Sequence, residues 1–294
     1  MVQYKVALRG GFSDRNGIKV ENTSIQMKEF DNRTRVALVN AIDKVINIRF
    51  DQLRFTSNKP GQYFLRQILS EVYGQIVDSN KRYDYEAVLN IVKNTIMSDD
   101  YDAVLSVVEY IINVVDSYPN FSFLSDGKRY NAGSFINTVF TREFVGYRFI
   151  APYITAITDD IEVKTIDDAL NNKSSDVKQH FEKALGFLSD RESPDYANSI
   201  KESISAVERM CSIIIGKPTT LGDALKKLED GGVTIHAALK GAFGKLYGYT
   251  SDASGIRHAG ELGGADSTFE EAKFMLVSCC AFVNYLTGLM AKCN

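Results

Sequence analysis

Apolar residues recur at alternating spacings of three and four along most of this 294-residue chain, and this period constrains the fold most strongly. A helical turn takes 3.6 residues, so such spacing places an apolar stripe on one face of a helix. Residues 175–189 and 198–215 both carry the pattern. The clearest example is residues 269–291, whose stripe contains Ala272, Leu276, Cys279, Val283, Leu286 and Met290. The sequence therefore predicts a mainly α protein with at most a few short strands.

The helical pattern divides into two predicted domains. The polar cluster at residues 171–175 has no apolar period, so we place a boundary there, between residues 1–172 and 173–294. Because the cluster is too short for a long linker, we expect the two domains to pack together. The helices of residues 173–294 are joined by short polar turns, which predicts a compact helical bundle. The strand candidates are Gln3–Leu8 and Tyr147–Ile157, and the latter is interrupted by Pro152.

Charge is distributed unevenly, although the whole chain has a net charge of only −3. Residues 1–66 hold twelve basic and six acidic residues, a net charge of +6, whereas residues 67–174 hold nine and sixteen, a net charge of −7. The basic segment, with Arg33 and Arg35 as candidate contacts, is suited to RNA. Because the two charges nearly cancel, docking of the first segment on the second is the other interpretation.

The composition indicates a cytoplasmic protein. None of the four cysteines forms a C-x-x-C pair, so we expect free thiols acting as small core residues. We expect no secretory signal, and no apolar run approaches a membrane span of about 18 residues. No two histidines lie three or four residues apart, so no helical metal site is predicted. No motif for a nucleotide cofactor is present either, and we expect neither metal nor cofactor.

The candidate catalytic residues are Arg257 and His258, which follow a polar, glycine-containing segment. Arginine is a permanently charged planar donor that suits phosphate, and histidine transfers protons near neutral pH. Such a pair suits metal-independent chemistry on a phosphodiester. The structural alternative is a turn in which Arg257 pairs with an acid and His258 caps a helix.

Other side chains complete the candidate site. Glu202 and Glu208 lie off the apolar face of their helix, and either could orient Arg257 or His258. Tyr247 and Tyr249 flank Lys245 and could stack on a base or contact RNA. For His180 and His236 a structural role is favoured. The acid pairs Asp159-Asp160 and Asp167-Asp168 are interpreted as charges near helix starts.

Two strings in the second half resemble the C-terminal helical domain of AbiJ-type abortive-infection proteins, which belongs to the HEPN superfamily. They run from Asp195 to Glu208 and from Leu246 to Ala259. The first half is similar to one class of AbiJ N-terminal domain, through Phe12-Ser13-Asp14-Arg15, Ile25-Gln26, Thr34-Arg35 and Gly146-Tyr147-Arg148-Phe149.

The resemblance implies a bacterial anti-phage or toxin-like protein whose HEPN-like bundle forms a homodimer and cleaves RNA without a metal. It also implies an unknown phage or host trigger. HEPN ribonucleases commonly separate their arginine from their histidine by several residues, whereas Arg257 and His258 are adjacent. The alternative is therefore a sensor that binds nucleic acid without cleaving it, or a dimerising interaction module.

Overall fold

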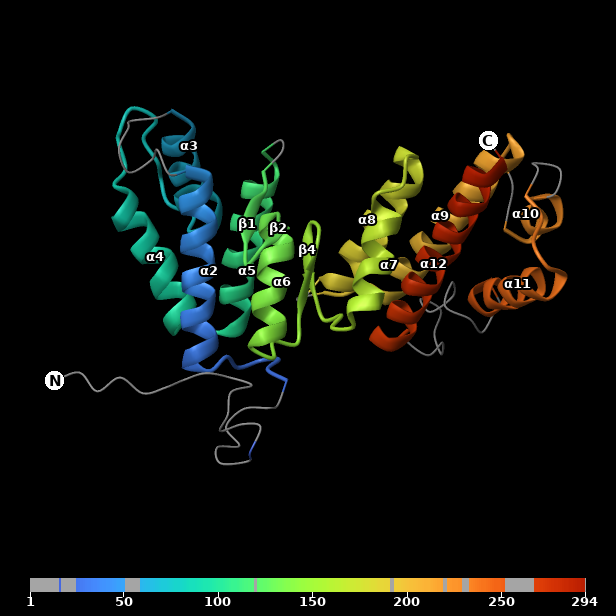
Figure 1. The fold of residues 1–294 in the computed structure, drawn as a ribbon, viewed down its shortest axis with the longest axis horizontal. Coiled ribbons are helices and arrows are strands. Elements are labelled where there is room, and N and C mark those ends of the chain that lie inside the picture. The colour runs from blue at the N-terminus through green and yellow to red at the C-terminus, as the bar shows by residue number, and fades with distance from the viewer. Residues whose placement is uncertain are drawn as a thin grey trace. The chain divides into compact units, whose positions relative to one another are not determined.

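The computed structural model describes residue 16 and residues 25–50, 59–118, 121–190, 193–218, 221–228, 233–251 and 267–293. The fold is mainly α, as the sequence predicts, with two small two-stranded sheets among the described residues. The chain divides into two compact units, residues 1–156 and residues 157–294. Figure 1 labels the elements of both units. The domain boundary that the sequence analysis places at residue 172 is not the same as this division into compact units, and it stays a prediction.

The helices of the first unit surround one core. Its elements, in chain order, are α2 (Asn32–Phe50), α3 (Lys59–Gln67), η2 (Ile68–Val72), α4 (Tyr85–Ser98), α5 (Tyr101–Asp116), β1 (Phe123–Ser125), β2 (Lys128–Tyr130), α6 (Ala132–Arg142), β3 (Arg148–Ile150) and β4 (Tyr153–Thr155). The side chain of Asp100 accepts the backbone N–H of Ala103 and so caps the start of α5.

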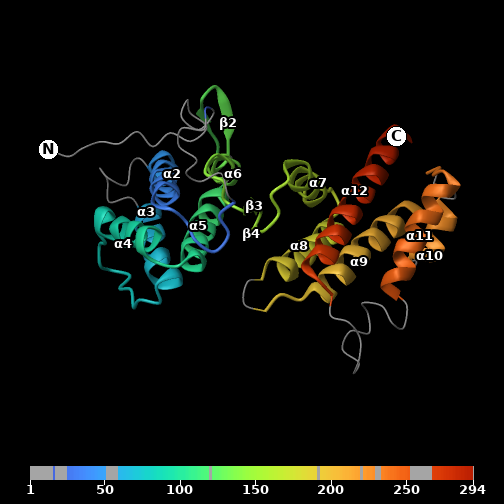
Figure 2. The ribbon, with the colours of Figure 1, turned by 90° about the horizontal axis from the view of Figure 1, so that it is seen from below.

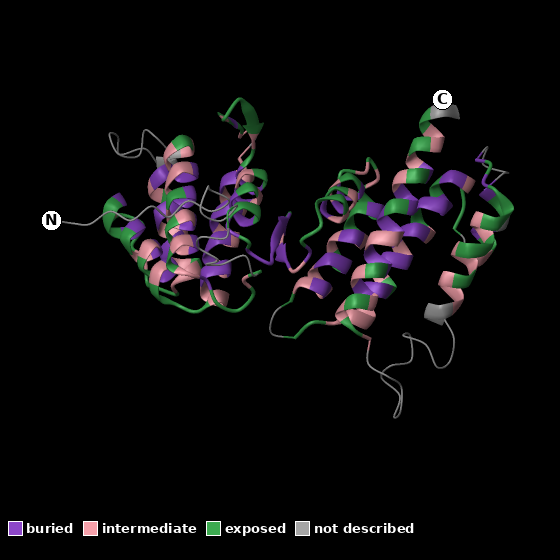
Figure 3. Cartoon of the chain, turned by 60° about the horizontal axis from the view of Figure 1, so that its bottom comes forward, coloured by how far each residue is buried: buried purple, intermediate pink, exposed green. Residues whose placement is uncertain are grey.

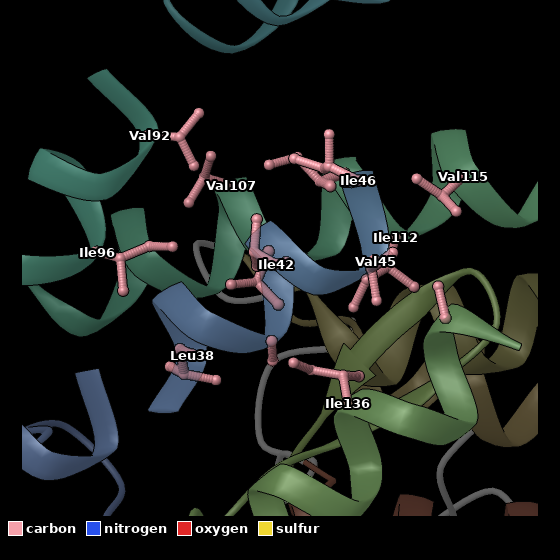
Figure 4. Close-up of a cluster of buried hydrophobic side chains, with 14 of the residues drawn as sticks. Leu38, Ile42, Val45, Ile46, Val92, Ile96, Val107, Ile112, Val115 and Ile136 are labelled. Carbon is pink, nitrogen blue, oxygen red and sulfur yellow. The ribbon is translucent and has the colours of Figure 1, made fainter. Parts of the chain in front are cut away.

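Aliphatic side chains fill the space between α2, α4, α5 and α6. Figure 4 shows Leu38, Ile42, Val45 and Ile46 of α2 at the centre, with side chains of the other three helices around them. Each of these four residues is at most 1% exposed. They recur at spacings of three and four, so the apolar stripe read from the sequence is the face that packs. Burial of such stripes is the main favourable contribution to the stability of the unit.

Two antiparallel hairpins complete the first unit. The predicted strand region Tyr147–Ile157 forms β3 and β4, which turn at Pro152. The hairpin of β1 and β2 was not predicted, and its turn contains Asp126 and Gly127, both with positive φ. The predicted strand Gln3–Leu8 lies outside the described residues.

A hydrogen-bond network around Gln26, here called the Gln26 network, joins the start of α2 to the end of α6. The Gln26 backbone N–H donates to Phe144 O and its O accepts from Gly146 N, both at 2.8 Å. The Gln26 side chain donates to Thr34 Oγ1 at 2.8 Å and to Glu143 O at 2.7 Å, and accepts from Asp31 N at 2.7 Å. These bonds hold residues 25–34 against residues 143–146, more than 100 positions away in the chain.

The second unit is a bundle. Its helices are α7 (Asp160–Leu170), α8 (Ser175–Ser189), α9 (Tyr196–Ile215), α10 (Leu221–Lys227), α11 (Ala237–Ser251) and α12 (Phe269–Cys293). Figure 2 shows α12 running beside α9, and Figure 3 shows buried residues on the facing sides of these helices. At the contact of α8 with α9, the buried hydroxyl of Ser199 donates to Ala184 O at 2.8 Å, and Ser203 donates to Ser199 O at 2.8 Å. These small side chains let the two helices approach closely.

The acid pairs occupy opposite ends of α7. Asp159 is the N-cap and Asp160 lies in the first turn, as predicted. Asp167 and Asp168 lie in the last turn, so their assignment to a helix start is wrong. Acids are unfavourable at a helix C-terminus, where the macrodipole is negative. Burial and the charge of Asp168 raise the pKa of Asp167 to about 6.

By length and composition, α12 is the one described helix that could cross a membrane, over Phe269–Ala291. By this criterion of length and composition, the expectation that no apolar segment approaches the length of a membrane span is wrong. Residues 272, 276 and 283 of α12 are nevertheless fully buried, and the helix packs on α7, α8 and α9. A core helix of a globular bundle passes the same test, so the feature is weak evidence for a membrane span.

The close approach at Gly146 gives a test of the Gln26 network. A Cβ at this position would overlap Met27 Sδ and lie 2.8 Å from Ile25 Cγ2. Because Met27 and Ile25 are 40% and 61% exposed and can move aside, Gly146→Ala should lower the free energy of unfolding by about 1 kcal/mol, the low end of the cost of overpacking. Chemical denaturation followed by circular dichroism measures this. Gly241→Ala is the control, because no described atom lies near its Cβ in α11, and it should be neutral or stabilising by up to about 1 kcal/mol. Equal effects of both substitutions would contradict the packing argument.

Candidate functional site

Arg257 and His258 lie outside the described residues, between α11 and α12 in the chain. The two helices themselves are in contact. Phe243 of α11 stacks on Phe282 of α12, with ring centroids 3.6 Å apart. In the chain, the candidate catalytic pair therefore falls between two helices that touch through these rings.

The predicted RNA contacts on α11 differ in exposure. Lys245 is exposed, and Tyr247 is half-buried with interactions of its own. Tyr249 is within α11, but its side chain lies outside the described part. Lys245 and Tyr247 are two positions apart in α11, so their side chains point to different faces of the helix and do not by themselves form one RNA-binding surface.

Glu202, one of the two predicted orienting acids, binds a different histidine. Its Oε2 lies 2.6 Å from Nδ1 of His180, across the contact between α8 and α9. A carboxylate on Nδ1 fixes the orientation of the ring and leaves Nε2 as the nitrogen for further chemistry. Sequence reasoning gave His180 only a structural role. The pairing of residues 22 positions apart depends on how α8 lies against α9.

The same helix contact carries an ion pair. Arg209 of α9 lies 2.5 Å from Asp176 of α8, with both side chains about half exposed. Glu208, the other predicted orienting acid, is half-buried and has interactions of its own, and its backbone O accepts from Ser212 Oγ at 2.8 Å. Charged side chains on α9 therefore reach α8.

Arg33, a predicted RNA contact, binds the buried carboxylate of Glu143. Its Nε donates to Glu143 Oε2 at 2.7 Å, and Arg142 Nε donates to Oε1 at 2.7 Å. Burial alone would raise the pKa of Glu143, but hydrogen bonds from the two arginines and their charges outweigh it and lower the pKa. This ion pair joins the basic segment to the acidic middle, which favours the docking interpretation for Arg33.

Arg35, the other predicted RNA contact, is a structural side chain in this fold. Its Nε donates to Phe30 O at 3.0 Å and its Nη1 donates to Ile96 O at 2.8 Å. Ile96 is in the last turn of α4, where carbonyls have no partner within the helix. The guanidinium therefore ties α2 to the C-terminal end of α4.

Metal and thiol chemistry have no support in the described residues. Among them, no group of three or more His, Cys, Asp and Glu side chains could hold a metal ion. Cys211, Cys279 and Cys280 are buried. Burial raises the pKa of Cys211 and of Cys279 to about 12, so neither is a thiolate nucleophile.

Comparison with known protein families gives a match to the family described as AbiJ N-terminal domain 4, over residues 10–172. This match covers more than half of the chain. The chain belongs to the AbiJ N-terminal domain 4 family. No curated protein and no solved structure matches it.

The described residues that carry the AbiJ resemblance in the first unit are structural. Gln26 and Thr34 belong to the Gln26 network, and Gly146 allows its close approach. The buried Arg148 donates from Nη1 to Val145 O at 3.0 Å and to Tyr147 O at 2.8 Å. These described motif residues of the first unit therefore hold backbone segments together.

The two interpretations of Arg35 predict different results. If the role of the guanidinium is to donate hydrogen bonds to the carbonyls of Phe30 and Ile96, Arg35→Ala should lower the free energy of unfolding by about 1–3 kcal/mol. This is the cost of leaving buried acceptors without a hydrogen bond. The control Arg129→Ala removes an exposed arginine from β2 and should change stability by less than about 0.5 kcal/mol. Urea denaturation measures both. Wild-type stability of Arg35→Ala together with weaker, salt-dependent RNA binding would instead support direct RNA contact.

Proposed function

We propose that this AbiJ-type protein acts in abortive infection, as a bacterial defence against phage, by binding and cleaving RNA in the cytoplasm. The observation that carries the proposal is the membership in the AbiJ N-terminal domain 4 family. The second unit is a helical bundle, and its sequence resembles HEPN domains at residues 195–208 and 246–259. Both facts support a HEPN-like catalytic domain at the C-terminus.

The proposed reaction uses only groups of the protein and the RNA. His258 removes the proton of a ribose 2′-OH, whose oxygen attacks the adjacent phosphorus. The new bond from O2′ to phosphorus forms as the bond to O5′ breaks, and the departing oxygen takes up a proton. Arg257 neutralises the charge that develops on the phosphoryl oxygens. No metal or cofactor is required for any of these steps.

The adjacency of the pair favours a site shared between two copies of the chain. Successive residues of a helix point about 100° apart, so if both residues are helical, Arg257 and His258 of one copy cannot easily face the same phosphate unless His258 lies at the helix start. A two-fold axis near Arg257 brings the arginine of one copy beside the histidine of the other. The same adjacency supports the second candidate function, a nucleic-acid sensor without turnover.

The catalytic proposal makes a specific mutational prediction. Arg257→Ala or His258→Ala should reduce RNA cleavage by about 10²-fold or more, the scale for loss of a charge stabiliser or an acid–base group. Arg257→Lys should rescue poorly, because lysine lacks the planar fork. The assay is EDTA-insensitive cleavage of labelled RNA by the full chain, with Arg129→Ala as a matched control. Folded variants that cleave like the parent would contradict the assignment, and a parent that never cleaves would favour the sensor.

Assembly gives an independent prediction. We expect a homodimer formed through the second unit, because the proposed active site takes one residue from each copy. Multi-angle light scattering should show twice the monomer mass at concentrations of about 10–50 μM, where even micromolar affinity is detected. A monomer throughout this range would exclude the shared site.

A further inference from the structure

A surface groove lies between α2 and α6 of the first unit, far in sequence from the candidate catalytic pair. Its volume is about 440 Å³, which lies in the range of small-molecule sites. We call it the α2–α6 groove. The lining residues used in the argument are Arg33, Val36, Asn40, Lys44, Phe135 and Arg142.

Three cations line the groove, against one carboxylate. Arg33 and Lys44 come from α2, and Arg142 is the last residue of α6. The carboxylate is Glu143, whose side chain is 1% exposed beneath the two arginines. Positive charge therefore exceeds negative charge at the surface of the groove, which favours an anionic ligand.

Glu143 also orients the arginines. It accepts the Nε–H of both, at 2.7 Å each, so the planar guanidinium groups are held before any ligand arrives. Arg142 is 58% exposed, and its two terminal amino groups have no protein partner among the described residues. A guanidinium fixed at Nε with its outer N–H groups in solvent is arranged to bind phosphate.

The remaining surface of the groove is apolar or neutral. Val36 is 41% exposed and contributes an aliphatic surface to the groove. The ring of Phe135 also lines the groove and has Lys44 Nζ 4.8 Å from its centroid. Asn40 is exposed and offers an amide donor and acceptor. These groups suit a flat, polar-edged ring such as a nucleobase.

We propose that the α2–α6 groove binds a nucleotide, with the phosphate on Arg33 and Arg142 and the base over the apolar surface around Val36. The nucleotide is either free in solution or part of single-stranded RNA, since both present the same chemistry. The groove is separate in sequence from Arg257 and His258, so the inference stands or fails independently of the cleavage proposal. A ligand here gives the first unit a means to sense a nucleic-acid signal.

The test is isothermal titration calorimetry of the full chain with adenosine monophosphate, inorganic phosphate and a short single-stranded RNA. Adenosine monophosphate should bind more tightly than inorganic phosphate, because the base adds contact area. Arg142→Ala should weaken binding about tenfold or more, the effect of losing charge-assisted hydrogen bonds. Asn40→Trp, which fills the groove but keeps its cations, should also weaken binding. If RNA binds tightly and adenosine monophosphate binds weakly, the ligand of the groove is single-stranded RNA and not a free nucleotide.

The controls separate this site from the catalytic one. Arg129→Ala removes an exposed arginine outside the groove and should bind adenosine monophosphate like the parent. Any loss of binding in Arg257→Ala instead reports nucleotide held at the proposed catalytic site. Thermal unfolding establishes that each variant is folded. The proposal is overturned if neither adenosine monophosphate nor RNA binds at millimolar concentration. It is also overturned if inorganic phosphate binds as tightly as the nucleotide, or if folded Arg142→Ala and Asn40→Trp bind unchanged.

Discussion

The carboxylate of Glu143 lies at the end of α6 with almost no exposure to solvent, and two arginines from different parts of the chain bind it. Burying a charge is costly unless it is paired and hydrogen-bonded, so this carboxylate constrains its surroundings. Arg33 must lie at the start of α2, and the backbone O of Glu143 must meet the side chain of Gln26. The position of α2 against α6, and with it the α2–α6 groove, depends on this pairing.

The residues that carry the sequence resemblance have structural roles in each of the two units. In the AbiJ N-terminal domain, the described residues that identify the family hold backbone segments together, which explains why Gln26, Gly146 and Arg148 suit these positions. Charged side chains at the surface of this domain lie close to these structural residues. In the second unit, the string at residues 195–208 forms the half of α9 that packs closely on α8 through Ser199 and Ser203. In both units, the described residues that carry the sequence resemblance thus belong to the packed framework.

The helices could be predicted from the sequence because each buries an apolar stripe with its own period. The β3–β4 hairpin was also predictable, since Pro152 interrupts an otherwise strand-like segment. The β1–β2 hairpin was missed, although Asp126-Gly127 is a strong turn signal. The partners of Arg33 and Arg35, Glu143 and Ile96, lie 110 and 61 positions away, so no local pattern reveals them. The pairing of His180 with Glu202 likewise depends on the packing of α8 against α9. Arg257 and His258 were identified from a sequence motif alone, and their catalytic role stays a prediction.

The central claim is that the protein cleaves RNA by attack of the ribose 2′-OH without a metal. The most direct measurement is mass spectrometry of the fragment ends produced by the purified full chain in EDTA. The account predicts fragments with 2′,3′-cyclic phosphate and 5′-hydroxyl ends, and no cleavage where a 2′-deoxy nucleotide replaces the attacking ribose. Fragments with 3′-hydroxyl and 5′-phosphate ends, or no cleavage of any RNA, would contradict it.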